Sequence, residues 1–95
     1  MTTRSFEDFA TQARAEGFEE VLERTWPART VLEGHTHPFA VKALLVEGEM
    51  WLTLGGETRH LVPGDEFAVE HGALHGERYG DEGAKYWVAR RTAVR

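Results

Sequence analysis

The chain has 95 residues, a formal net charge of −5 and no cysteine. The length fits one modest domain, and a hydrophobic fraction of 41% is ordinary for a folded protein. The acidic balance argues against a nucleic-acid partner, and no apolar run approaches the roughly 18 residues of a membrane span. Without cysteine there are neither disulfides nor thiolate metal ligands. The first residues also lack a secretory pattern, and we expect a cytoplasmic protein.

The first 17 residues show the pattern of an amphipathic helix. Ser5 offers a capping hydroxyl, and Asp8 follows it by three residues. Apolar residues then recur at helical spacing until Gly17, a typical helix stop. The pattern predicts a helix over about residues 6–16, within an N-terminal segment 1–17.

After Gly17 the chain changes to short apolar segments separated by glycine and proline, which is typical of strands. Between two of them, Gly55–Gly56 indicates a tight hairpin, because such turns need positive φ. Together the segments predict an all-β fold, an antiparallel barrel or jelly roll, as a single domain over residues 18–95. The expected strands are 18–26, 30–32, 40–47, 50–54, 57–61, 66–70, 76–79 and 85–91.

Two histidines, His35 and His37, stand two residues apart directly before an apolar run. If they lie on a strand, its period of two points both imidazoles to the same face. Such a pair either provides two ligands of a metal site or is simply two polar side chains where a strand begins. A third ligand would favour the metal site. The candidate is His75, which follows a turn at the start of a later strand.

The segments around these histidines resemble the two sequence motifs of the cupin superfamily, in particular its small single-domain members. The first motif is a His-x-His, a carboxylate four residues later and then a glycine; the second is a Pro-Gly-Asp turn, an apolar strand and a late histidine. Here they read His35-Thr36-His37, Val41 and Gly48, followed by Pro63-Gly64-Asp65 and His75. The resemblance covers about residues 30–90. It implies a β-barrel with a metal site in its interior.

Two positions depart from the cupin pattern. Val41 stands where the carboxylate ligand is usual, and Glu70 replaces the proline before the last histidine. The metal ligands implied are therefore His35, His37 and His75. Three neutral imidazoles suit a divalent ion such as Zn, Fe, Ni, Mn or Cu, and they leave coordination positions open. Without the carboxylate the ion keeps its full charge, which favours an anionic or chelating small molecule.

Further residues are candidates for the surroundings of the site. Glu70 and His71 could support the ligands from a second layer, although a solvated position is the default for both. Arg78 and Lys85 are candidates to hold an anion near the mouth of the barrel. The expected pocket residues, each with core or interface as the alternative, are Val41, Leu45, Trp51, Tyr79 and Trp87.

Strand alternation also makes a prediction about the two faces of the segment after Val41. If Val41 points inward, Ala43 and Leu45 do so too, while Leu44 points outward. Continued alternation predicts an apolar outer face of Leu44, Val46, Met50, Leu52 and Leu54. Such a face needs cover, and we expect a homodimer that uses it together with the segment Phe18–Trp26. The alternative is a monomer in which the helix folds back over the sheet.

The leading functional hypothesis is a small metal-binding cupin that binds or transforms a small molecule. If it is an enzyme, the resemblance implies a metal-dependent oxygenase of the non-heme-iron type, or an isomerase. The competing hypothesis is a non-catalytic binding or sensor protein, with or without a metal.

Overall fold

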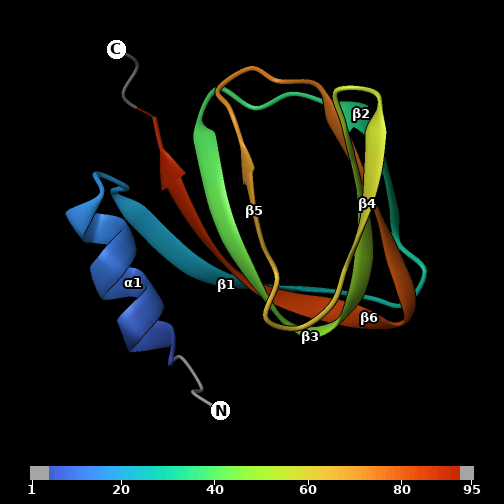
Figure 1. Ribbon diagram of the computed structural model, residues 1–95, viewed down its shortest axis with the longest axis horizontal. Coiled ribbons are helices and arrows are strands. Elements are labelled where there is room, and N and C mark those ends of the chain that lie inside the picture. The colour runs from blue at the N-terminus through green and yellow to red at the C-terminus, as the bar shows by residue number, and fades with distance from the viewer. Residues whose placement is uncertain (1–4, 93–95) are drawn as a thin grey trace.

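The computed structural model describes residues 5–92: a helix, α1, followed by six strands that pair antiparallel around a common interior (Figure 1). The helix lies outside the barrel, beside β1 (Figure 1). The all-β fold with one N-terminal helix, as predicted, is confirmed. The elements are α1 (Phe6–Ala15), β1 (Glu20–Trp26), β2 (Val31–His35), β3 (Ala40–Leu54), β4 (Glu57–Leu61), β5 (Glu66–Val69) and β6 (His75–Arg91).

Local signals fix the ends of α1 as expected. The Ser5 hydroxyl accepts a hydrogen bond from the Asp8 amide at 3.0 Å, and the Asp8 carboxylate accepts one from the Ser5 amide at 3.3 Å. Gly17, with φ of +98°, lies directly beyond the C-cap. Within residues 5–92, no helix is long and apolar enough to cross a membrane.

The predicted β3–β4 hairpin is also confirmed. Gly55 and Gly56 have φ values of +63° and +83° and join Leu54 to Glu57, which face each other across the two strands. Both central residues need positive φ in this turn, and glycine adopts it without strain.

Two predicted strand breaks are wrong. Segments 40–47 and 50–54 form the single strand β3, and segments 76–79 and 85–91 belong to the single strand β6. Gly48 at φ +80° bends its strand, and the β3–β6 register shifts on both sides of it. A Cβ on Gly48 would lie 2.1 Å from the Gly83 carbonyl oxygen, so glycine allows the two strands to approach closely there.

The irregularity around Gly48 changes which residues face the core. Ala43 and Leu45 point into the barrel, as predicted. Beyond the bulge, Met50 and Leu52 also point inward and are 0% and 1% exposed. Their expected position on the outer face is therefore wrong, because a bulge inserts a residue and shifts the alternation.

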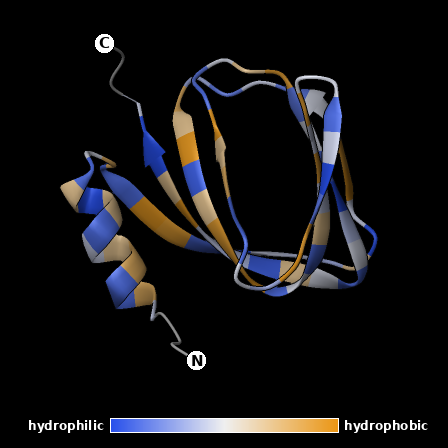
Figure 2. Ribbon diagram, in the orientation of Figure 1, coloured by the Kyte–Doolittle hydropathy of each residue, from blue (hydrophilic) through white to orange (hydrophobic). Residues whose placement is uncertain are grey.

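The outer face before the bulge is covered by α1. Leu44 packs there against Phe9 and Trp87, and hydrophobic and hydrophilic residues share the surface of the helix (Figure 2). The Lys42 ammonium group also binds the Glu16 carboxylate at 2.7 Å. The prediction that Leu44 points outward is confirmed, and its cover is the chain's own helix.

Candidate metal centre

The three histidines singled out in the sequence lie together inside one end of the barrel. His35 ends β2 and faces His75, the first residue of β6. His37 follows two residues later, and one ligand nitrogen from each ring lies within 4.8 Å of the others. The ring centroids are 4.3 Å apart for His35 and His75, 4.7 Å for His35 and His37, and 5.2 Å for His37 and His75.

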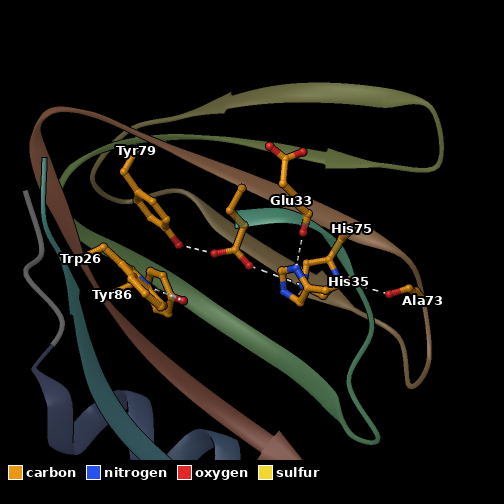
Figure 3. Close-up of polar contacts among 8 residues, drawn as sticks. Trp26, Glu33, His35, Ala73, His75, Tyr79 and Tyr86 are labelled. Atoms are coloured by element: carbon orange, nitrogen blue, oxygen red, sulfur yellow. Dashed lines mark hydrogen bonds and ion pairs between the residues drawn. The ribbon is translucent and has the colours of Figure 1, made fainter. Parts of the chain in front are cut away.

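Backbone carbonyls orient two of these rings (Figure 3). His35 Nδ1 lies 2.7 Å from the Glu33 carbonyl oxygen, and His75 Nδ1 lies 3.1 Å from that of Ala73. A carbonyl only accepts hydrogen bonds, so in each neutral ring Nδ1 carries the hydrogen and Nε2 keeps its lone pair. This arrangement is typical of metal-binding histidine, whose second nitrogen is held by the protein.

His37 is held differently. Its ring stacks on Phe39 with the centroids 4.8 Å apart. Burial lowers the pKa of His37, and the neighbouring His35 and His75 lower it further. Burial and crowding thus favour the neutral imidazole, which is the form that binds a metal ion.

This cluster also contains a carboxylate that was not predicted from the sequence. Glu77 is only 8% exposed, and its Oε2 lies 3.4 Å from His75 Nε2. Its other oxygen, Oε1, accepts a hydrogen bond from the Tyr79 hydroxyl. When Nδ1 of His75 carries the hydrogen, Nε2 and the carboxylate are both acceptors. Two acceptors this close repel each other, and a proton or a cation near both would relieve the repulsion. The signal was present, because Glu77 follows His75 by two residues and so shares its face of the strand.

Two tyrosines and a tryptophan, Tyr79, Tyr86 and Trp26, provide further polar contacts near Glu77 (Figure 3). Tyr79 stacks on Trp26 with the centroids 5.6 Å apart, and Trp26 Nε1 donates a hydrogen bond to the Tyr86 hydroxyl at 3.0 Å. Burial raises the pKa of both tyrosines, and the nearby Glu77 raises the pKa further. Both phenols are therefore neutral, and Tyr79 acts as the donor that fixes Glu77.

The other predicted pocket residues are dispersed. Val41 is half-buried beside the cluster, and Leu45 lies in the packed core. Trp51 lies on the outer surface between His60 and Arg78, with its ring centroid 4.7 Å from that of His60 and 4.1 Å from the Arg78 guanidinium carbon.

Trp87 does not line the barrel interior. It faces Leu44 across β3 and β6 and therefore points to the same side, under α1. Its indole nitrogen donates a hydrogen bond to Glu23 at 3.0 Å.

The proposed supporting residues Glu70 and His71 both have exposed side chains. The turn that carries them is joined to the site through its backbone, since the Gly72 amide donates a hydrogen bond to the His37 carbonyl at 3.0 Å. Within residues 5–92, neither side chain contacts the three imidazoles.

A cavity of about 420 Å³ opens onto the cluster, which is within the range of small-molecule sites. It adjoins a narrower space of about 40 Å³ that reaches Val41. A larger depression of about 720 Å³ meets His75 from the side of Trp51 and Leu74. The residues that line the 420 Å³ cavity include His35, His37, Glu77, Tyr86, Arg24 and Arg90.

No protein-family model matches this sequence, and a search of the curated proteins finds no match. Solved structures do match. KdgF from Halomonas sp. has a TM-score of 0.69 and 23% identity, over 78% of this chain and 68% of that one. An RmlC-like cupin from Shewanella frigidimarina has a TM-score of 0.65 and 21% identity, over 74% and 63%. The DMSP lyase DddQ from Ruegeria pomeroyi has a TM-score of 0.64 and 28% identity, over 75% and 36%.

These similarities identify the fold as that of the cupin superfamily, in agreement with the resemblance of the two sequence motifs. The matched region corresponds to between 36% and 68% of the length of the three proteins. A fold of this kind carries many different reactions, so the function must be argued from the site.

Proposed function

We propose that this chain is a metal-binding cupin in which His35, His37 and His75 hold a divalent ion that binds a small molecule. The observation that carries the proposal is the convergence of three imidazoles, two of which have Nδ1 directed to a backbone carbonyl and so keep the lone pair on Nε2. Convergence of the rings and a fixed orientation of Nδ1 are together typical of histidines that bind a metal ion.

The donor set fits a borderline divalent ion. Neutral imidazoles suit Zn, Fe, Ni, Mn and Cu, and three of them leave coordination positions for water or a ligand. Such an ion would act as a Lewis acid or, if it is redox-active, would activate oxygen. The chain's own contribution is to hold the three rings, to fix Glu77 beside them through the Tyr79 hydroxyl, and to provide the cavity.

An enzymatic role as an oxygenase or isomerase is our first functional candidate, and a non-catalytic binding or sensor role is the second. Structures of similar fold include a DMSP lyase and an oxalate decarboxylase. These names describe those proteins, and the variety of their reactions leaves both roles open for this chain. Oxygen consumption and turnover with candidate thiols or diketones would separate the two.

Metal reconstitution tests the proposal directly. Protein made without a His-tag should bind about one Zn²⁺ or Co²⁺ per chain by calorimetry, and Co²⁺ should give a visible d–d spectrum of imidazole coordination. The His71→Ala variant is a matched control, since it removes an exposed imidazole near the site. A stoichiometry far below one ion per chain would contradict the proposal.

We also propose a homodimer, as expected from the sequence, although the face first assigned to it has changed. Met50 and Leu52 are inside the barrel, and Leu44 lies under α1. The exposed apolar side chains that remain include Val31 and Leu74, which are 53% and 65% exposed. Sedimentation equilibrium at low micromolar concentration tests the proposal, and a mass of one chain that does not change on concentration would end it.

A further inference from the structure

Two arginines on different strands point into the barrel beside the imidazoles. Facing residues of antiparallel strands lie on the same side of a sheet. Arg24 of β1 faces Tyr86, and Arg90 of β6 faces Val41. Tyr86 belongs to the barrel core and Val41 packs against it. The register therefore directs both arginines inward, and both line the 420 Å³ cavity with His35 and His37.

Arg90 is only partly satisfied where it lies. Its Nη1 is 3.3 Å from the Glu20 carboxylate, while its Nε is buried and has no hydrogen-bond partner. A buried donor without a partner is costly and calls for an explanation. Its guanidinium carbon lies 4.9 Å from the centre of the Phe39 ring, the ring on which His37 stacks. Arg90 is thus joined to the metal-ligand cluster through one aromatic side chain.

Arg24 provides a second cation at the same cavity. Its guanidinium carbon lies 4.9 Å from the centre of the Trp26 ring, and within residues 5–92 it forms no ion pair with a carboxylate. Glu77, the buried acid of the cavity, accepts a hydrogen bond from the Tyr79 hydroxyl and has its other oxygen 3.4 Å from His75 Nε2, and Glu33 is exposed. Neither arginine is therefore neutralised by the acids that line the cavity.

We propose that Arg24 and Arg90 bind the carboxylate of a small organic acid, the other end of which reaches the ion held by the three histidines. This inference rests on the proposed function, because it concerns the ligand of the same site. Guanidinium groups match carboxylates in shape and bind them through two parallel hydrogen bonds. With Nη1 engaged by Glu20, Nε is a donor of Arg90 that still lacks a partner.

The position opposite Arg90 provides no carboxylate of its own. Val41 faces Arg90 across the two strands and is apolar, so it leaves the guanidinium without an acidic partner on that side. The two cations first considered for holding an anion are placed elsewhere: Arg78 lies over Trp51 on the outer surface, and Lys85 lies 3.4 Å from Glu47.

The test uses succinate and its uncharged analogue succinamide, titrated into metal-free and Zn²⁺-loaded protein by calorimetry. Succinate should bind the loaded protein at least about tenfold more tightly than succinamide, because charge-assisted hydrogen bonds to carboxylates are the strong ones. The Arg90→Met and Arg24→Met variants should each weaken succinate binding by about tenfold or more and leave Zn²⁺ binding intact. Arg90→Lys keeps the charge without the paired donors, so its affinity for succinate should lie between that of the parent protein and that of Arg90→Met.

Arg78→Met is the matched control, since it removes an arginine from the outer surface, and it should bind succinate like the parent protein. Circular dichroism confirms the fold of each variant, and Arg24→Met provides the test if Arg90→Met does not fold. Equal affinity for succinate and succinamide, or unchanged succinate binding in a folded Arg24→Met or Arg90→Met variant, would overturn the inference. Zn²⁺ binding without succinate binding would refute this inference alone. Succinate binding that depends on the arginines, with no Zn²⁺ binding, would refute the proposed metal centre and its part in holding the ligand.

Discussion

The barrel interior has two halves with different chemistry. In one half Met50, Leu52 and Leu61 are between 0% and 1% exposed and pack against one another. In the other, imidazoles, a carboxylate and two guanidinium groups surround a cavity of about 420 Å³. Packed apolar side chains stabilise a fold, whereas polar groups that line a cavity cost stability unless a ligand satisfies them. The difference separates the part of the molecule that supports the fold from the part that is available for chemistry.

The largest expected effect comes from removing a ligand in the polar half. His37→Ala leaves two imidazoles, and two ligands rarely hold a divalent ion, so Zn²⁺ affinity should fall by more than about 100-fold. The fold should remain, because His37 is only half-buried. Calorimetry measures the affinity and circular dichroism the fold. The exposed His60 provides a control, and His60→Ala should bind like the parent.

A core truncation in the packed half should show the opposite behaviour. Leu52→Ala removes a fully buried side chain and should lower the free energy of unfolding by about 2–4 kcal/mol. Zn²⁺ affinity of the folded protein should be nearly unchanged. Urea unfolding and calorimetry on the same sample measure the two quantities. A loss of metal affinity in a fully folded sample would show that the two halves are coupled.

Val41→Glu adds a charge at the edge of the polar half. The new carboxylate should tighten Zn²⁺ binding by about tenfold, equivalent to roughly 1.4 kcal/mol. Because Arg90 faces this position, the same carboxylate should compete with succinate for the guanidinium. Calorimetry with each ligand tests both effects. Unfolding without any change in metal content would mean that residue 41 serves only the core.

A further effect is expected at the support of Glu77. Tyr79→Phe removes the hydroxyl that donates to Glu77 Oε1 while it keeps the ring that stacks on Trp26. Losing one partner of a buried carboxylate should cost about 1–3 kcal/mol of folding stability. Zn²⁺ affinity should change by a smaller factor than in His37→Ala. Thermal unfolding with and without Zn²⁺ measures both, and stability equal to that of the parent would show that water replaces the hydroxyl.

The features predicted correctly from the sequence depend on neighbours in the chain. The α1 cap and the Gly55–Gly56 hairpin are local patterns. His35 and His37 are neighbours in the chain and do converge, although His37 lies beyond the end of β2 and not on a strand. The motif spacing added His75. Each of these inferences needs only the positions of a few residues.

The errors and omissions depend on distant strands. A glycine such as Gly48 can end a strand or bend it, and only its approach to Gly83 decides which, so the inward position of Met50 and Leu52 was not predictable. The inward positions of Arg24 and Arg90 depend on the register of β1 and β3 on β6. Glu77, by contrast, could have been found, because it lies two residues beyond His75 on the same strand face.

The placement of β2 has a dynamic consequence. Within residues 5–92, β2 pairs only with β6, whereas β6 also pairs with β1 and β3. A short strand with one neighbour opens more readily than a strand held on both sides. Because His35 ends β2 and His75 begins β6, an ion bound to both would fasten the less protected strand to the more protected one. Metal at about 100 times its dissociation constant would add about 2.7 kcal/mol against that opening, so the hydrogen exchange of β2 amides would itself report how firmly the ion is held.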